Sequence, residues 1–142
     1  MKTNDINLLK GHVKDAALSW VDSQIDLLLP NKAAGRAILK NAANNILARY
    51  DEKINNGIDT AFLLFADEKG NIDSDSIVDS LCSMLEEMST SDYALGPFSA
   101  RIGKGEICID FPRSFFSELI AGDIGGVKIT TDDIKQIKNF LK

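Results

Sequence analysis

The acidic stretch at residues 67–75 comes closest, in residue type and spacing, to a metal-binding loop. A calcium-binding EF-hand loop places oxygen ligands at its first, third, fifth and twelfth positions and glycine at its sixth. Counted from Asp67, the third, sixth and twelfth positions hold Lys69, Ile72 and Val78, so three requirements fail. We therefore interpret the stretch as a turn followed by a capped helix, and we expect no metal.

Histidine and cysteine, which often act as catalytic bases and nucleophiles, are few in this chain. His12 is the single histidine, and Cys82 and Cys108 lie in apolar patterns without a CxxC motif or a Cys/His cluster. A catalytic nucleophile needs an adjacent base, and structural zinc needs four ligands. We therefore expect two free thiols, no catalytic residue, no metal or other cofactor, and no enzymatic activity. A disulfide is the alternative, and it fits a reducing compartment poorly.

Two glycine-rich segments resemble parts of phosphate-binding loops. Gly103-Lys104-Gly105 is too short for such a loop, and no helix follows it. The segment 122–126, Gly-Asp-Ile-Gly-Gly, lacks the preceding strand and the following helix of a dinucleotide-binding fingerprint. Both segments are therefore interpreted as turns.

The charge balance disfavours nucleic acid and anionic membranes as partners. Sixteen basic residues are dispersed among 21 acidic ones, which gives a net charge of −5. Phosphate contacts need clustered lysine and arginine, and the chain has no such run. The longest apolar runs are too short to span a bilayer, and residues 1–10 do not resemble a secretion signal. We expect a cytoplasmic protein with no nucleic-acid or membrane partner.

The spacing of apolar residues predicts helices over most of the first 90 residues. Helical patterns cover residues 5–29, 31–55 and 74–88, and Pro30 ends the first of them. Asn55-Asn56-Gly57 is interpreted as a break. The stretch 58–66 fits a short buried helix or a strand, and a helix is favoured because Asn56 or Asp59 could cap it.

The pattern changes to strands after residue 90. Residues 93–102 and 106–111 alternate around the turn at 103–105, and residues 127–130 form a further short strand. Pro112 opens a short helix to about Gly122, and Thr130 or Thr131 caps a final helix. We predict a single α+β domain over residues 1–142. Its helical N-terminal half of three to four helices (about 1–90) packs with a small antiparallel sheet in a β-β-α-β-α C-terminal half (about 91–142).

The first helix has a wider apolar arc than one docked face requires. Trp20, Leu27 and Leu28 belong to its main stripe, and four more apolar residues lie beside that stripe: Leu18, Val21, Ile25 and Leu29. A solvent-exposed patch of this kind is one that monomers tend to avoid. We therefore expect these four residues to form an interface for a second copy of the chain or for a protein partner. The alternative is that the β-containing half covers them within the monomer.

Two tracts resemble small uncharacterised proteins encoded by phages and prophages of gut bacteria. They are IGKGEICIDFP at residues 102–112 and VKITTDDI at residues 127–134. The resemblance covers about the last two-thirds of the chain and carries no catalytic signature. It implies a phage or mobile-element origin, a location in the host cytoplasm or the virion, and a role in the virion, in assembly or in host modulation.

Three hypotheses for the function follow. The first is a non-enzymatic interaction or structural protein that forms an oligomer or joins an assembly. The second is an acidic regulatory or inhibitory protein that binds a basic host protein. The third is an enzyme with an unrecognised site, which a deep polar pocket would favour.

Overall fold

Helix α1 (Ile6–Leu28) is the longest element and confirms the helix predicted for residues 5–29. The computed structural model describes residues 2–141 of the chain. The Asp5 carboxylate caps the helix by accepting the backbone N–H of Leu8 at 3.1 Å. Pro30 follows shortly after the last helical residue, and its missing N–H prevents the helix from continuing.

The next two helices, α2 (Ala33–Arg49) and α3 (Asp51–Phe65), are almost continuous and meet at Tyr50. The single helix predicted for residues 31–55 is therefore wrong in its boundaries. The helical preference for residues 58–66 is confirmed, because most of this stretch forms the end of α3. The expected burial holds for Ile58 and Ala61 and is wrong for the end of the helix, where three apolar residues are exposed: Leu63, Leu64 and Phe65.

The break predicted at residues 55–57 is wrong because Gly57 allows close packing instead of a turn. Helix α4 (Ser74–Glu87) packs against α3. A Cβ atom on Gly57 would lie 2.9 Å from Cδ2 of Leu81 on α4. An alanine at this position would therefore require the Leu81 side chain to shift.

Helix α4 begins where the sequence predicts. Its cap is Asp73, whose carboxylate accepts the backbone N–H of Asp75 at 3.2 Å. Upstream, the Asp67 carboxylate accepts the N–H groups of Lys69 and Asn71, both at 2.9 Å. The acidic stretch 67–75 is therefore a turn and a helix cap, as its composition indicated.

Both ends of the described chain are tied to the helical part. Strands β1 (Lys2–Thr3) and β2 (Ile72–Asp73) form a short antiparallel pair next to the start of α4. At the other end, Nε2 of His12 donates to the backbone carbonyl of Leu141 at 2.9 Å. The single histidine thus fixes the C-terminal segment onto α1.

Four antiparallel strands form the main sheet, in the order β3 (Ser91–Leu95), β4 (Phe98–Gly103), β5 (Glu106–Asp110) and β6 (Gly126–Thr130). The sequence predicted two strands before the connection to β6, and the structure has three. The reason is that Gly96, with φ of 60°, starts a two-residue hairpin turn instead of interrupting one strand. The turn predicted at residues 103–105 is confirmed.

The connection from β5 to β6 holds less helix than predicted. A short 3₁₀ helix, η1 (Arg113–Phe115), and a series of turns replace the helix expected over residues 112–122. The predicted cap at Thr130 is confirmed: it begins α5 (Thr131–Ile134) with a reciprocal pair of hydrogen bonds to Asp133. The chain then continues as a second 3₁₀ helix, η2 (Lys135–Phe140).

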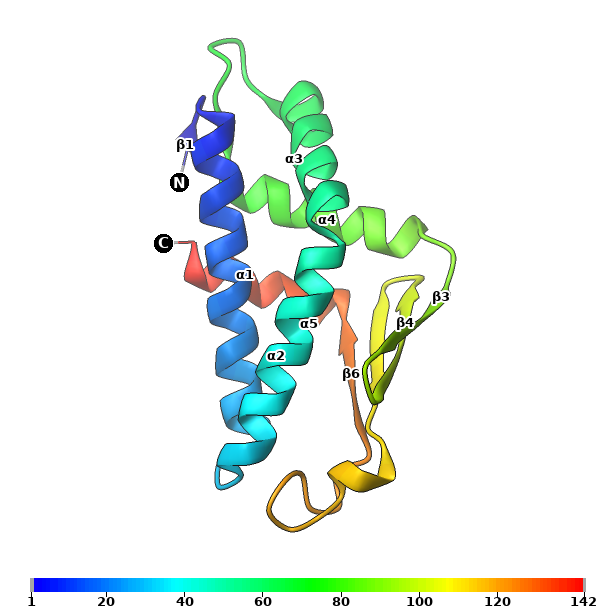
Figure 1. Cartoon of the computed structure of the whole chain (residues 1–142). Coiled ribbons are helices and arrows are strands. Elements are labelled where there is room, and N and C mark those ends of the chain that lie inside the picture. The colour runs from blue at the N-terminus through cyan, green and yellow to red at the C-terminus, as the bar shows by residue number, and fades with distance from the viewer. Residues whose placement is uncertain (1, 142) are drawn as a thin grey trace.

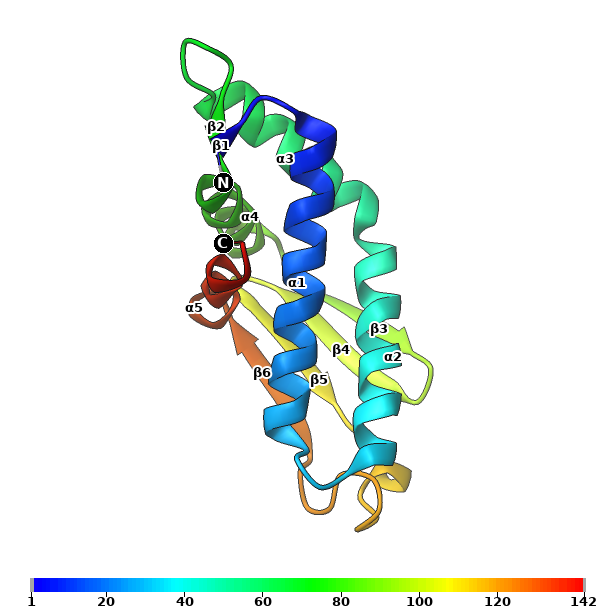
Figure 2. The ribbon, with the colours of Figure 1, turned by 90° about the vertical axis from the view of Figure 1, so that its left-hand side faces the viewer.

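The helices cover one face of the sheet. Figure 2 shows α1 and α2 side by side in front of the strands, and Figure 1 shows α4 crossing the helices near the upper end of the sheet. Along β4, Phe98, Ala100 and Ile102 are buried toward the helices, while Ser99 and Arg101 are exposed. The predicted α+β class, with a helical N-terminal half and a sheet in the C-terminal half, is confirmed.

The buried side chains form two clusters, which we call the helical core and the sheet core. The helical core joins the first half of α1 to α3, α4 and η2 through Leu9, Val13, Ala16, Trp20, Ile58, Ala61, Ile77, Val78, Cys82 and Ile137. The sheet core joins the second half of α1 to α2 and the strands through Ile25, Leu29, Leu39, Ala42, Phe98, Ala100, Ile109, Phe111 and Phe115. Val21 contacts both cores.

Gly35 on α2 provides a test of how tightly the sheet core is closed. A Cβ atom there would overlap the carbonyl oxygen of Ile120, whereas a Cβ atom on Gly11, on the exposed side of α1, would have nothing within 4 Å. We expect Gly35→Ala to lower the free energy of unfolding by about 1–3 kcal/mol. Gly11→Ala should raise it by roughly 0.5–1 kcal/mol, because alanine favours a helix. Urea titration followed by Trp20 fluorescence measures both, and a similar effect in the two variants would contradict the packing.

Candidate functional site

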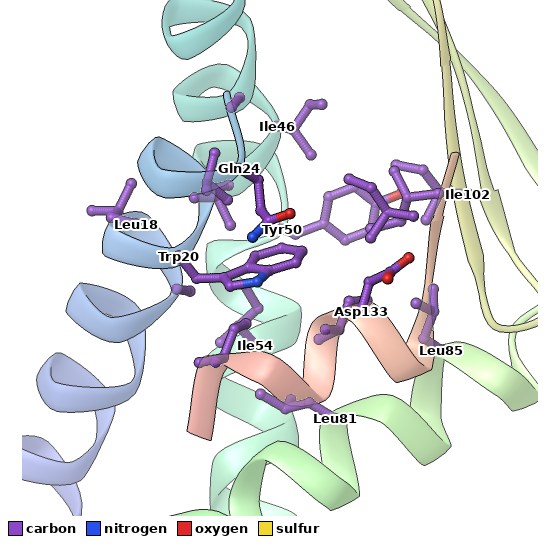
Figure 3. Close-up of a pocket in the computed structure, with 18 of the residues that line it drawn as sticks. Leu18, Trp20, Gln24, Ile46, Tyr50, Ile54, Leu81, Leu85, Ile102 and Asp133 are labelled. Carbon is purple, nitrogen blue, oxygen red and sulfur yellow. The ribbon is translucent and has the colours of Figure 1, made fainter. Parts of the chain in front are cut away.

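A cavity of about 720 Å³ lies between the α1–α2 pair and the sheet, where the two cores meet. Figure 3 shows side chains from the helices and the sheet side converging on it. Most of its lining is aliphatic and comes from several elements, as in Val21, Ala43, Ile46, Leu81, Leu85 and Ile102. Small-molecule sites have volumes of about 300–1,000 Å³ and linings of this kind.

The cavity is open to solvent. Its exposed lining residues lie on α1, α2, α3 and β6: Leu18, Gln24, Asn44, Ala48, Asp51 and Lys128. These residues mark where the cavity opens, and we call this rim its mouth.

Four of the described residues that line the cavity carry charge: Lys14, Asp51, Lys128 and Asp133. Lys14 lies 2.6 Å from the Asp51 carboxylate, and Lys128 lies 3.0 Å from that of Glu106. Oδ2 of Asp133 accepts the backbone N–H and the hydroxyl of Thr130, at 3.0 and 3.1 Å, and both of these donors are neutral groups. The lining therefore carries two positive and two negative side chains.

Tyr50, at the junction of α2 and α3, contributes its aromatic ring to the lining. Figure 3 shows the ring reaching from the helix toward Ile102 on the sheet. The ring packs edge-on against Tyr93, with centroids 5.7 Å apart, and the Lys53 ammonium lies 5.7 Å from its centroid. The hydroxyl oxygen is covered by protein atoms. Burial, and after it the interaction with the neighbouring Tyr93 side chain, raises the pKa of Tyr50 well above its ordinary value, so the group stays protonated.

Trp20 forms part of the wall from the α1 side. Its indole N–H donates to the Gln136 side chain at 3.3 Å, which fixes the ring against η2. The ring is almost completely buried, and it is the only tryptophan in the chain. Its fluorescence therefore reports on the contents of the cavity.

The structure places the four residues predicted as an interface in different environments. Ile25 and Leu29 are 6% and 1% exposed and belong to the sheet core, so the sheet side covers them within the chain. This corrects the expectation for these two residues, which are not accessible to a partner. Val21 is half-buried between the two cores, and Leu18 is 37% exposed at the cavity mouth. Leu18, Val21 and Ile25 all line the cavity.

The other chemical candidates have structural roles. Cys82 and Cys108 are free, as predicted, and the Cys82 thiol lies 3.8 Å from the Thr131 carbonyl. Burial raises the pKa of the Cys82 thiol, which keeps it protonated and unreactive. Within residues 2–141 no group of three His, Cys, Asp or Glu side chains is placed to hold a metal ion. In the same part of the chain, no helix combines the length and apolar character needed to cross a bilayer.

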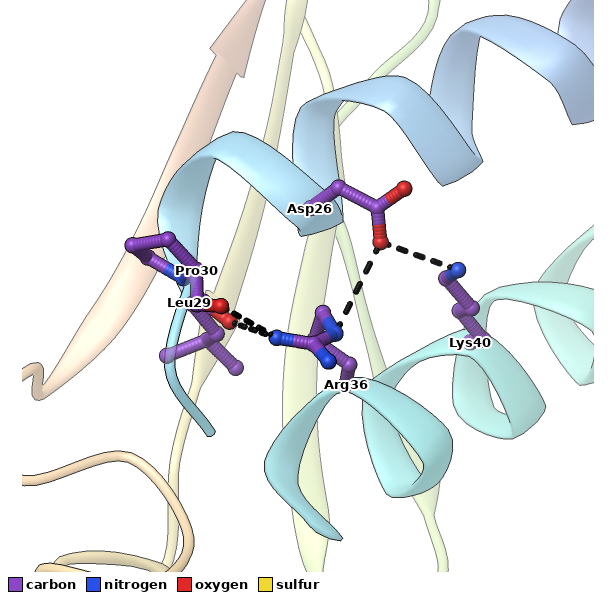
Figure 4. Close-up of polar contacts among 5 residues, drawn as sticks. All are labelled: Asp26, Leu29, Pro30, Arg36 and Lys40. Atoms are coloured by element: carbon purple, nitrogen blue, oxygen red, sulfur yellow. Dashed lines mark hydrogen bonds and ion pairs between the residues drawn. The ribbon is translucent and has the colours of Figure 1, made fainter. Parts of the chain in front are cut away.

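The turn that joins α1 to α2 fixes two of the helices that frame the mouth. The Arg36 guanidinium donates to the carbonyls of Leu29 and Pro30, both at 2.7 Å, where α1 ends (Figure 4). The Leu29 carbonyl also accepts the backbone N–H of Lys32 at 3.3 Å. The arginine adds a charged donor to both carbonyls, where the helix itself can no longer supply one. Asp26 on α1 lies 3.0 Å from the Lys40 ammonium and 3.8 Å from Arg36.

The sequence pattern predicted neither the cavity nor the position of Tyr50 at its lining. Tyr50 falls on the apolar side of a pattern that continues into α3, with no glycine or proline to indicate the break. The available signal was the wide apolar arc of the first helix. It indicated a second apolar surface, and the structure shows that part of this surface faces a cavity.

Comparison with protein-family models, with curated proteins and with solved structures finds no match for the chain. The resemblance to phage-encoded proteins therefore stays a prediction. The argument for function rests on the geometry of the cavity and of the exposed surfaces.

The contacts of Arg36 can be tested against those of Lys40. We expect Arg36→Gln to lower the free energy of unfolding by about 1.5–3 kcal/mol, because it leaves two carbonyls without a charged donor. Lys40→Gln removes only a half-exposed ion pair with Asp26 and should cost less than about 1 kcal/mol. Chemical denaturation measures both. A larger loss for Lys40→Gln would show that the ion pair, and not the capping arginine, holds the turn.

Proposed function

We propose that this chain is a non-enzymatic binding protein that holds a small apolar molecule between the α1–α2 pair and the sheet. The observation that carries the proposal is the apolar cavity of about 720 Å³. Its volume and lining resemble those of small-molecule sites, where a few polar groups orient a mostly apolar ligand. Gln24 and Asn44 are uncharged polar side chains at its lining.

The cavity leaves apolar side chains in contact with water, because several of its lining residues are exposed to solvent. A bound apolar molecule would remove this surface from water, which is favourable by about 25 cal/mol for each Å² of apolar surface. A molecule that binds only the folded state also stabilises that state by mass action.

The arrangement of polar groups supports binding without catalysis. General acid–base chemistry needs a titratable side chain within reach of the reacting atom. At this cavity the Asp51 carboxylate pairs with Lys14, and Oδ2 of Asp133 accepts from Thr130. His12 is not among the lining residues, and its ring is bound to the Leu141 carbonyl. The Tyr50 hydroxyl is protonated, so it favours hydrogen bonding over proton transfer.

Ligand binding can be measured with the neutral dye N-phenylnaphthylamine and the emission of Trp20. We expect saturable binding at one site, an increase in dye emission, and a loss of Trp20 emission by energy transfer. The melting temperature should rise with dye concentration. Ala43→Leu, which fills part of the cavity, should weaken binding about tenfold or more, equivalent to about 1.4 kcal/mol. It should also raise the free energy of unfolding by about 0.5–2 kcal/mol.

Ala37→Leu is the matched control, because it adds the same side chain to α2 on its exposed side, away from the cavity. It should leave dye binding unchanged. The proposal fails if wild-type protein does not bind the dye, or if Ala43→Leu and Ala37→Leu bind it equally well.

The exposed end of α3 supports a second candidate function, self-association. Leu63, Leu64 and Phe65 are 86%, 68% and 58% exposed, and Figure 1 shows this end of α3 rising past α4. Adjacent large apolar groups on a surface mark interaction sites. We propose a second copy of the chain as the partner, in keeping with an interaction or assembly role.

Double substitution of Leu63→Lys and Leu64→Lys tests this surface. Both side chains are exposed, so we expect stability to change by less than about 0.5 kcal/mol. The mass by light scattering should fall from that of a dimer to that of a monomer. Leu119→Lys, at another exposed leucine, should leave the dimer intact. A wild-type protein that is monomeric at high concentration would contradict the proposal of self-association.

A further inference from the structure

Asp133 is the charged residue at the cavity lining that has no opposite charge beside it. The other charged side chains of the lining belong to ion pairs, in which Lys14 lies 2.6 Å from Asp51 and Lys128 lies 3.0 Å from Glu106. Within residues 2–141, no lysine, arginine or histidine lies within ion-pair distance of the Asp133 carboxylate. The two ion pairs are neutral as units, so the Asp133 carboxylate leaves the cavity wall with one uncompensated negative charge.

One oxygen of this carboxylate is held by the fold and the other is available. Oδ2 accepts the backbone N–H and the hydroxyl of Thr130, whereas Oδ1 accepts no hydrogen bond from any described residue. The side-chain atoms of the described residues that are both buried and unpaired belong to Tyr50 and Asn55, so Oδ1 of the half-buried Asp133 is not fully covered by the protein. Figure 3 shows the carboxylate pointing from α5 toward Ile102, among the other lining side chains. Oδ1 is thus an unused acceptor at the cavity.

The surroundings of the carboxylate favour a cation as its partner. The two Thr130 donors are neutral groups, and most of the nearby lining is aliphatic. A ligand that fills this space displaces water from the carboxylate, and a charge that loses its water needs a compensating partner. A hydrogen bond from a cationic donor to a carboxylate is roughly twice as strong as one between neutral groups. An anion would instead meet a charge of its own sign, with both lining lysines already paired.

We propose that the cavity binds a molecule with an apolar body and one protonated amine, whose ammonium group donates to the Asp133 carboxylate. The inference rests on the proposed function and narrows it to a ligand class. The apolar body would lie against the aliphatic lining. The two hydrogen bonds from Thr130 hold the carboxylate in place before the ligand arrives, which lowers the entropy that binding costs.

Competition against N-phenylnaphthylamine with three compounds of similar shape tests the ligand class. Naphthylmethylamine is protonated at neutral pH, ethylnaphthalene replaces its ammonium with a methyl group, and naphthoate carries a negative charge. In Asp133→Asn the ratio of amine affinity to hydrocarbon affinity should fall about tenfold or more, the value of a hydrogen bond between charged groups. Using the ratio cancels the different hydration of the two compounds. Naphthoate should bind wild-type protein more weakly than the amine.

Asp133→Asn separates the charge from the capping role, because asparagine keeps one oxygen that can accept from Thr130. Asp132→Asn is the matched control: it removes the same charge from the same turn of α5, and Asp132 is exposed and does not line the cavity. It should change the affinity ratio by less than about twofold, since solvent and salt screen an exposed charge. A melting curve for each variant confirms that the binding data come from folded protein.

The outcomes separate this inference from the function on which it rests. Failure of the dye and all three compounds to bind wild type overturns both. Binding of the amine and the hydrocarbon with a ratio that Asp133→Asn does not change, or that Asp132→Asn lowers equally, overturns the amine assignment alone. Binding of naphthoate to wild type as tightly as the amine also overturns it, and this comparison does not depend on the folding of any variant.

Discussion

The structure depends on one helix that supports two separate hydrophobic cores. The first half of α1 packs on α3, α4 and η2, and the second half packs on α2 and the sheet. Val21 lies between them and contacts both. The sheet and the α3–α4 pair approach α1 at different places along its length, so the side chains between them do not close the space. The cavity at this junction is thus a consequence of how the two cores share α1.

Two glycines permit close contacts between elements of the two cores. Gly57 on α3 lies against the Leu81 side chain on α4, and Gly35 on α2 lies against the backbone of Ile120. On the sheet side, Phe98, Phe111 and Phe115 pack edge-to-face with centroids 4.8–5.7 Å apart. The apolar cavity lies between these two packed regions.

The wide apolar arc of the first helix shows how a correct observation led to an incomplete interpretation. The pattern correctly indicated a second apolar surface along Leu18, Val21, Ile25 and Leu29. The spacing of apolar residues shows which face of a helix is apolar, but it does not show which other element packs on that face. The sheet core covers Ile25 and Leu29, and Val21 and Leu18 lie at the cavity and its mouth. The exposed apolar residues at the end of α3 were expected to be buried, since a continuous apolar run gives no sign of where the neighbouring helix ends.

The amino-acid pattern was enough to predict the α+β class, the limits of α1 and α4, the hairpin at residues 103–105 and the cap at Thr130. The local features depend on local chemistry: a proline, a capping carboxylate, a glycine turn, or a hydroxyl followed by an acid. The break at Tyr50, the packing of Gly57 and the cavity arise only when the elements pack together. These depend on contacts between residues far apart in the chain, such as Tyr50 with Tyr93 and Gly57 with Leu81. Local preferences do not contain that information, because a side chain acquires its neighbours only when the elements pack together.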